Sequence, residues 1–486
     1  MEGRSAPRQP AVPGARVIAE HEQEMHAHRL MTLWAHFANI ALGFWLVASP
    51  VTFGYLSMTF PADSPVLAVT AERGLPLPEV RNLAMAWSDV LSGVALVVFG
   101  ALSLTRRWAW FAQWAAAFVG IWLLFAPLLF WTPSPGAYAN DTLVGTLAIT
   151  FSVLVPMMPG MSMKAMALGP DIPPGWDYSP SDWLQRIPII AMALVGFFIA
   201  RYLAAYQLGH TDRVWDPFFG DGTVRIITSD VSRAWPVADA GLGATAYMLE
   251  ALSGAMGSRR RWRTMPWMVA MFGLLVVPLG AVSIIFIIIQ PIVIGTWCTL
   301  CLVQALAMVV MIPYSLDELV AMGQFLVDVR RRRGSFWSNF LHGGVMEGGR
   351  RMERSELDGA LPAMLRDMVS GGVNYPWTLV LGALIGVWLM FTRLTLDAVG
   401  AMANSDHLVG SLVIVVAFSA FAEVARPLRF INAAFGVWLV AAPWVLDGAS
   451  AAGTVGSVVA GLALVALSLP RGAVRGRYAG WNRLIV

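Results

Sequence analysis

The two cysteines of the chain, Cys298 and Cys301, are separated by two residues in the string Trp297-Cys298-Thr299-Leu300-Cys301. A pair placed at random on 486 residues would rarely fall this close together, so the spacing indicates selection for chemistry. On a helical turn such a pair can close a disulfide, and the dipole of a helix N-terminus favours the thiolate of the first sulfur. The pair therefore predicts thiol–disulfide chemistry, with two inert buried thiols as the alternative.

Zinc binding is the other chemistry that two cysteines can support, and it requires two further good ligands. Of the seven histidines, only His210 lies in a loop that is expected at the cysteine side of the same block. We therefore predict no metal site.

Membrane-spanning helices must position this pair. Hydrophobic residues make up 57% of the chain and charged residues 13%, whereas soluble domains are about one-quarter charged. At roughly 20 residues per crossing, the apolar runs predict an all-α polytopic membrane protein with about twelve transmembrane helices. The expected spans are 33–53, 84–104, 109–130, 141–160, 187–207, 234–256, 266–289, 293–313, 376–396, 406–425, 430–447 and 453–470. This leaves no room for a large soluble catalytic domain. Membrane topology accounts for the small excess of arginine, so no nucleic-acid partner is expected.

Arginines gather in alternate short loops of this scheme. The basic segments on the side of the N-terminus include 106–107, 259–263, 330–333 and 471–477. By the positive-inside rule this side is cytoplasmic. An even number of spans returns the chain to its starting side, so we expect both termini in the cytoplasm. The cysteines are then expected near the outer surface, where disulfides persist, and membrane lipid is an expected partner.

A helix-pair repeat occurs four times. Its first helix carries Gly-x-Trp-Leu followed by proline at 43–50, 120–127 and 436–443, and in a further copy at 386–393 Arg393 replaces the proline. The second helix carries Asp and, four residues later, Gly, beginning at Asp89, Asp141 and Asp406; a version without Asp is assigned to 453–456. Gly lets helices approach, Trp supplies a large amphipathic contact near an interface, and Pro ends the apolar run. These are packing roles; the alternative is a ligand cleft between the two repeat pairs, with the three aspartates and Arg393 as candidate residues.

The repeats resemble the SPW repeat family of bacterial membrane proteins over about 35–160 and 376–470. Ser49-Pro50 keeps two of the three signature letters, as does Pro443-Trp444. The resemblance implies little biochemistry. It implies a multi-pass protein of a bacterial-type inner (plasma) membrane.

The block at about 181–315 has four expected spans and both cysteines. A long outer loop ending in the string 226–229 precedes its second span, and the Cys-x-x-Cys pair opens its fourth. In these features the block resembles the vitamin K epoxide reductase family over roughly 185–315. The resemblance implies a four-helix bundle with a quinone, ubiquinone or menaquinone, bound against the cysteines. It also implies that Cys301 faces the quinone while Cys298 exchanges with a thiol donor.

The same resemblance supplies the other candidate site residues. Ser229 stands where the family's loop string ends in serine and is a candidate to hydrogen-bond a quinone oxygen, with helix capping as the alternative. Phe218, Phe219, Thr223 and Trp297 are candidates for quinone contact, although aromatic residues at a membrane interface are usually belt residues.

Thr223 also marks a departure from the family. It occupies the position of the second loop cysteine, and no cysteine is left in the chain to be the first. The family's relay through a loop pair therefore cannot run within this chain. We expect an external thiol protein or a small thiol as electron donor. The alternative is a non-catalytic membrane scaffold or a quinone- or lipid-binding subunit of a larger complex.

The chain is thus expected to have five parts: a cytoplasmic tail (1–32), SPW-like repeats 1 and 2 (33–180), the four-helix bundle (181–315), a cytoplasmic amphipathic linker (316–375), and SPW-like repeats 3 and 4 with a basic tail (376–486). Within the linker, apolar residues at 316–333 predict an amphipathic helix in the plane of the inner leaflet, and a second amphipathic stretch lies at 357–369. The linker is a candidate docking site for a cytoplasmic partner, or a plain surface connection.

Overall fold

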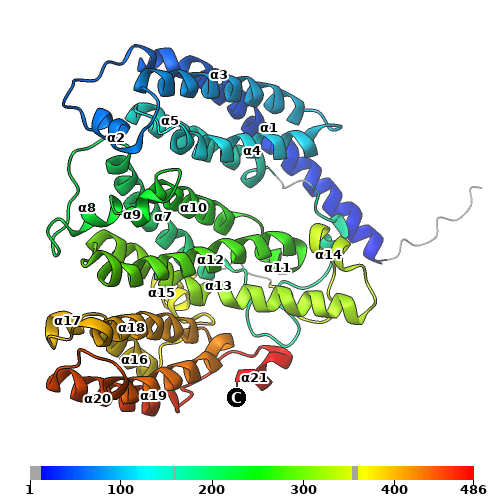
Figure 1. Cartoon of the computed structure of the whole chain (residues 1–486). Helices are drawn as coiled ribbons and strands as arrows, with labels where there is room; N and C mark the ends of the chain where they lie inside the picture. Colours follow the sequence, from blue (N-terminus) through cyan, green and yellow to red (C-terminus); the bar gives the residue numbers. More distant parts are fainter. Residues whose placement is uncertain (1–12, 157–159, 353–358, 486) are drawn as a thin grey trace, which may run out of the picture.

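The computed structural model describes residues 13–156, 160–352 and 359–485 (Figure 1). Within these ranges the chain folds into helices joined by short connections, and no β-strand occurs among them. Nine of the described helices are long and apolar enough to cross a membrane. The predicted fold class, an all-α polytopic membrane protein, is confirmed.

Twelve principal helices form three successive groups, which we call the N-terminal layer, the central bundle and the C-terminal layer. The N-terminal layer has α1 (Pro13–Thr52), α3 (Pro78–Ser103), α4 (Ala109–Leu129) and α5 (Pro135–Ile149). The bundle has α7 (Trp183–Gln207), α10 (Asp239–Ala255), α12 (Pro266–Ile289) and α13 (Thr299–Arg331). The C-terminal layer has α16 (Trp377–Met390), α18 (Gly400–Phe421), α19 (Arg429–Val445) and α20 (Ala451–Ser468). In Figure 1 the bundle lies between the two layers.

Three of the predicted spans correspond to helices that are not among the nine candidate membrane-spanning helices. These are α5, α10 and α16, with 15, 17 and 14 residues. Short helices fill the connections: α2 (Pro65–Arg73), α6 (Met163–Ala167), α8 (Gly222–Ile227), α9 (Asp230–Arg233), α11 (Arg261–Thr264), α14 (Phe336–His342), α15 (Leu361–Ser370), α17 (Thr392–Thr395) and α21 (Asn482–Ile485).

Each layer consists of two helix hairpins, and the helices of each hairpin meet at a pair of glycines. A Cβ atom on Gly43 of α1 would lie 2.5 Å from the carbonyl oxygen of Gly93 of α3, so only glycine permits this approach. The same contact joins α4 to α5, α16 to α18 and α19 to α20, through the pairs Gly120 and Gly145, Gly386 and Gly410, and Gly436 and Gly461. The repeat is therefore a backbone-to-backbone helix contact.

The fourth repeat copy has a different register from the one predicted. Its partner glycine is Gly461, not a glycine of 453–456. Because the other copies place Asp four residues before this glycine, the equivalent position is Ser457. Ser457 donates a hydrogen bond to Asp406, its counterpart in the neighbouring hairpin, at 3.2 Å. The assignment at 453–456 was wrong because it matched a pair of glycines that does not contact α19.

The repeated tryptophans link the two hairpins of a layer. The indole of Trp122 donates to Ser88 at 3.0 Å, that of Trp45 to Asn140 at 2.8 Å, and that of Trp438 to Ser405 at 2.9 Å. Each acceptor directly precedes the repeat aspartate. We expected a contact with the membrane interface, and these tryptophans also carry a specific bond between hairpins.

The linker prediction at 316–333 needs correction. These residues do not form a separate in-plane helix, because α13 continues without a break from Thr299 to Arg331. A helix of 33 residues is about 50 Å long, well beyond a hydrocarbon core of about 30 Å. Its second half packs on protein: Phe325 is fully buried against Trp262, and Tyr478 belongs to the same cluster. The apolar stripe is thus covered by protein and not by lipid.

Buried polar contacts at this arginine-rich end of the molecule connect its parts. Arg261 of α11 pairs with Glu318 of α13 at 2.6 Å, with both side chains almost fully buried. Tyr478 of the C-terminal tail donates to Glu423 at 2.8 Å. On α15, Leu361 and Leu365 stay exposed, so a partner at 316–375 remains a prediction.

Candidate redox site

Cys298 and Cys301 form a disulfide at the first turn of α13, with their Cα atoms 5.2 Å apart. Cys298 caps the helix, and its sulfur lies 3.0 Å from the amide nitrogen of Cys301. When the disulfide is reduced, this amide and the helix dipole favour a thiolate at Cys298. Cys298 is fully buried, whereas Cys301 is partly exposed, so the two sulfurs differ in access.

A break at the end of α12 shapes the segment before the cysteines. Pro291 lacks an amide hydrogen, and the helix passes into a π-helical turn, η3 (Gln290–Ile294), which ends at Gly295 with φ 81°. The buried Gln290 side chain accepts a hydrogen bond from the Cys298 amide at 3.0 Å. The break therefore creates the turn that holds the first cysteine in place.

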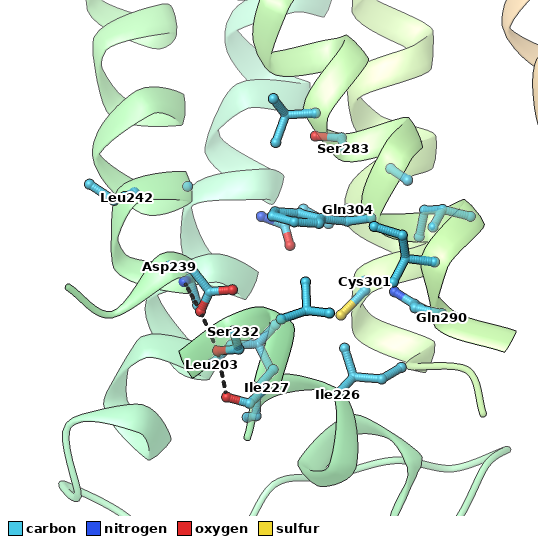
Figure 2. A pocket seen from close by; sticks show the side chains of 18 of the residues that line it. Leu203, Ile226, Ile227, Ser232, Asp239, Leu242, Ser283, Gln290, Cys301 and Gln304 are labelled. Atoms are coloured by element: carbon cyan, nitrogen blue, oxygen red, sulfur yellow. Dashed lines mark hydrogen bonds between the residues drawn. The ribbon is translucent and has the colours of Figure 1, made fainter. Parts of the chain in front are cut away.

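A cavity of about 260 Å³ lies beside Cys301, between α10, α12 and α13. In Figure 2 the Cys301 sulfur and the Gln290 side chain are close neighbours in its wall. Most of the lining is apolar, and the polar side chains in it are Ser229, Ser232, Asp239, Ser283, Gln290 and Gln304. A mostly apolar cavity with a few polar groups suits a flat, weakly polar ring such as a quinone.

Residues 208–233, which we call the lid, cover the cysteine end of the bundle. Its residues Ile226 and Ile227 line the cavity and share an apolar cluster with Cys298. Gln207, at the end of α7, donates to the Ile227 carbonyl at 2.9 Å and so ties the lid to the bundle. The two isoleucines therefore contribute to the burial of Cys298.

Asp216 is the second tie between the lid and the bundle. One carboxylate oxygen accepts hydrogen bonds from the amides of Phe218 and Phe219 and from the hydroxyl of Thr299 on α13. The other accepts from the amide and hydroxyl of Thr223, at 3.0 and 2.6 Å. Burial raises the pKa of Asp216, but the hydrogen bonds outweigh it and lower the pKa to about 2. Asp216 is ionised at neutral pH, and this charge fastens the lid next to the cysteines.

The predicted site residues divide between the cavity and its surroundings. Cys301 and Ser229 line the cavity. The Ser229 hydroxyl also donates to the Ile226 carbonyl at 2.8 Å and caps α9, so the alternative of helix capping describes its contacts in the structure. Cys298, the other half of the disulfide, does not line the cavity and packs in an apolar cluster with Ile227.

The four candidates for quinone contact lie outside the cavity lining. Phe218 is 78% exposed on the lid, and the buried Thr223 is bonded to Asp216. Phe219 and Trp297 pack on each other with ring centroids 5.6 Å apart. The aromatic residues in the cavity wall are Trp235, Tyr247 and Phe286.

Sequence reasoning missed the polar residues of the cavity other than Ser229, although a signal for two of them existed. Gln290 and Gln304 lie inside strongly apolar segments, and a polar side chain within a membrane span is costly unless it has a function or a partner. Gln304 also follows Cys301 by three residues, which places both on one helix face.

The repeat aspartates do not gather into a cleft with Arg393. Asp89 is buried and accepts hydrogen bonds from Ser49, at 3.2 Å, and Tyr55. In the C-terminal layer, Asp406 accepts a hydrogen bond from Ser457. Arg393 instead donates to the Pro291 carbonyl of the central bundle. In place of the proposed ligand cleft, the aspartates make contacts within their own layers and Arg393 contacts the central bundle.

Comparison with known families assigns the three groups of helices. Residues 187–316 match the vitamin K epoxide reductase family. The central bundle is vitamin K epoxide reductase-like. Residues 76–155 and 376–470 match the SPW repeat domain, which confirms the second resemblance and leaves α1 outside the matched range. No curated protein and no solved structure was found to match the chain.

Proposed function

We propose that the protein is a thiol–disulfide oxidoreductase that couples Cys298 and Cys301 to a membrane quinone. The family match supports a membrane redox role of the vitamin K epoxide reductase kind in general. The observation that carries the specific proposal is the position of the Cys301 sulfur, which is half of a disulfide and lines a mostly apolar cavity. Sulfur and acceptor could therefore meet without rearrangement of the bundle.

The two sulfurs have distinct parts in the reaction. A donor thiolate attacks the Cys298 sulfur, the bond to Cys301 breaks, and Cys301 leaves as a thiolate at the cavity. A second donor thiol then attacks its partner sulfur in the mixed disulfide, which releases the donor as a disulfide and leaves both protein cysteines reduced. A quinone, when bound, supplies an acceptor for two electrons and two protons. The protein disulfide re-forms as the pair gives these up, so the net result is one new disulfide in the donor.

Other residues of the cavity hold and shield the reacting groups. The Gln290 side chain fixes the Cys298 amide, and Gln304 lies one helical turn beyond Cys301 with its side chain in the wall. Asp239 accepts from the Ser232 hydroxyl at 2.9 Å, which secures the lid to α10 (Figure 2). These contacts hold the lid and the first cysteine against the bundle.

The electron donor is an external thiol, because the lid carries no cysteine. Since Cys298 is fully buried, the donor must wait for the lid to open. We further propose a bacterial-type plasma membrane, with the arginine-rich end and both termini in the cytoplasm and the lid outside. Whether the protein uses ubiquinone or menaquinone depends on which of the two quinone rings fits the cavity better.

The test follows both thiols of the reduced, purified full chain by alkylation and mass shift after a short-chain ubiquinone or a short-chain menaquinone is added. We expect quinone-dependent loss of both thiols. In Cys301→Ala the remaining thiol should stay alkylatable. Gly243→Leu, which narrows the cavity, should raise the quinone concentration needed, whereas Gly323→Leu, at a helix position open to space, should not.

Thiols that stay reduced with either quinone, in folded protein, would refute the oxidoreductase proposal. The function would then be that of a non-catalytic membrane scaffold or a quinone- or lipid-binding subunit. The burial of Cys298 and the absence of loop cysteines favour this alternative. Quinone binding that raises the melting temperature without oxidising the thiols would identify the binding subunit.

A further inference from the structure

The break in α12 leaves a backbone carbonyl without its helical partner. In a regular helix the amide of residue 291 would donate to the carbonyl of Ile287, but Pro291 has no amide hydrogen. A buried carbonyl without a hydrogen bond is costly, so another donor is needed. His407 of α18, in the C-terminal layer, lies with its Nε2 3.0 Å from the Ile287 oxygen.

A second side chain of the C-terminal layer contacts the same break. Arg393 of α17 donates from Nη1 to the carbonyl of Pro291 at 2.9 Å, and it also bonds the Asn404 side chain. Around these bonds, Trp297 packs against Phe391 with ring centroids 5.5 Å apart. The turn that precedes the cysteines is thus held from outside the bundle.

The repeat makes these two residues stand out. The position of Arg393 holds Pro50, Pro127 and Pro443 in the other three copies. The position of His407 holds Val90, Thr142 and Val458. Packing within a hairpin therefore does not require arginine or histidine here. Both departures occur in the hairpin of α16 and α18, whose helix α18 contacts α12 and reaches its break.

The held segment is part of the redox site. Ile287, Ile289, Gln290 and Ile294 all line the cavity, and Gln290 bonds the Cys298 amide. A shift of this turn would move both the cavity wall and the first cysteine.

We propose that His407 and Arg393 are positioning residues for the Cys298–Cys301 pair, and that the C-terminal SPW layer serves to fix the turn that carries it. The positioning role concerns only the stability of the Cys298–Cys301 disulfide. Any effect of these two residues on oxidation by quinone rests on the proposed function.

The two ring nitrogens of His407 face different partners, so variants that imitate one nitrogen or the other can distinguish the positioning role from packing within the hairpin. Nε2 faces the Ile287 carbonyl of the bundle, whereas Nδ1 lies 3.1 Å from the Met390 carbonyl of its own hairpin. A glutamine side chain can place a donor near the position of Nε2, and an asparagine near that of Nδ1. A neutral imidazole carries one N–H, and the proposed role places it on Nε2. His407→Gln should therefore keep a donor at the Ile287 carbonyl, whereas His407→Asn offers one only at the Met390 carbonyl.

The experiment measures the reduction potential of the disulfide in the purified full chain, by equilibration with glutathione buffers followed by alkylation and mass shift. A loosened turn brings the two thiols together less often, so His407→Phe and His407→Asn should make disulfide formation roughly tenfold less favourable, about 30 mV more oxidising. Arg393→Met should shift the potential in the same direction. His407→Gln should remain near the wild-type value.

Thr142→Val is the matched control. Thr142 stands at the His407 position of another copy and accepts a hydrogen bond from Arg201 of α7 at 2.8 Å, remote from the break. Its potential should equal that of the wild type. The proposal is overturned if folded His407→Phe keeps the wild-type potential, or if Thr142→Val shifts it equally. A shifted potential in a protein that quinone does not oxidise would refute the proposed function and leave the positioning role standing.

Discussion

The lid should control how fast a thiol or phosphine reaches the disulfide, and Asp216 is the residue whose change tests this. In Asp216→Asn the carboxylate charge is lost, so the bond from Thr299, which ties the lid to α13, becomes a weaker neutral hydrogen bond. The amide nitrogen also cannot accept the two bonds from Thr223 that hold the lid in shape around this tie. Hydrogen bonds to a charged group contribute about 1.5–3 kcal/mol each. Because Asp216 is only partly buried, we discount the weakened tie to Thr299 and the loss of the two bonds from Thr223 together to about 1.5 kcal/mol. The open fraction of the lid should then rise roughly tenfold.

The assay is the rate at which a water-soluble phosphine reduces Cys298–Cys301 in the purified full chain, followed by alkylation and mass shift. The control is Asp212→Asn, since Asp212 is exposed on the same lid and pairs only weakly, at 3.8 Å, with Arg213. We expect about tenfold faster reduction for Asp216→Asn and no change for the control. Equal rates in all three proteins would mean that the reductant reaches the disulfide without lid opening, and the reasoning would fail.

The pH dependence of the same rate has a defined sign. The folded-state pKa of Asp216 is about 2, below the ordinary value of 3.8, so its contribution is present above the ordinary value and is lost as the pH falls toward 2. Between pH 8 and pH 5 the ratio of variant to wild-type rates should be constant. A ratio that falls within this range would contradict the assigned pKa.

Two further predictions concern the contacts that hold the helices together. Glu318→Gln leaves the buried Arg261 without its charge partner and should cost about 3–5 kcal/mol, seen as a lower melting temperature in detergent. Gly461→Ala places a Cβ 2.5 Å from the Gly436 carbonyl and should separate α19 from α20 at a cost of about 1–3 kcal/mol, whereas Gly323→Ala meets no atom within 4 Å and should be neutral or slightly stabilising. A melting temperature lowered equally by both glycine changes would refute the close-contact interpretation.

The sequence predicted the spans and the cysteine pair, but it did not predict which side of the pair faces the cavity. Trp297 adjoins Cys298 in the chain yet points to the C-terminal layer, where it meets Phe391. The cavity lies instead along the face of α13 that begins at Cys301 and includes Gln304, Ala305 and Met308. These residues follow at helical spacing, so this stripe was predictable from periodicity once α13 was taken as the carrier.

Other features needed three dimensions. The extent of α13 beyond the membrane could not be predicted from amphipathicity, because an apolar stripe at 316–333 looks the same whether lipid or protein covers it. Only the packing of Phe325 against Trp262, far away in the sequence, distinguishes the two. The position of the lid candidates outside the cavity lining was unpredictable for a similar reason, because a loop sequence reveals aromatic residues but not that the Phe218 side chain is exposed.

Departures from an internal repeat carry information that the repeat itself does not. Where the copies share a residue, the contact that explains it lies within the layer, as the glycine pairs and the repeated tryptophans show. Where one copy differs, the cause lies outside it. Thr142 and His407 replace the valines of the two outer hairpins, and each contacts the central bundle, through Arg201 and Ile287 respectively. Both hairpins next to the bundle thus use the same repeat position to bind it. The bundle and its flanking layers are fitted to each other as one unit, so a bundle excised from this chain should lose the support of its cysteine turn even if its four helices still fold.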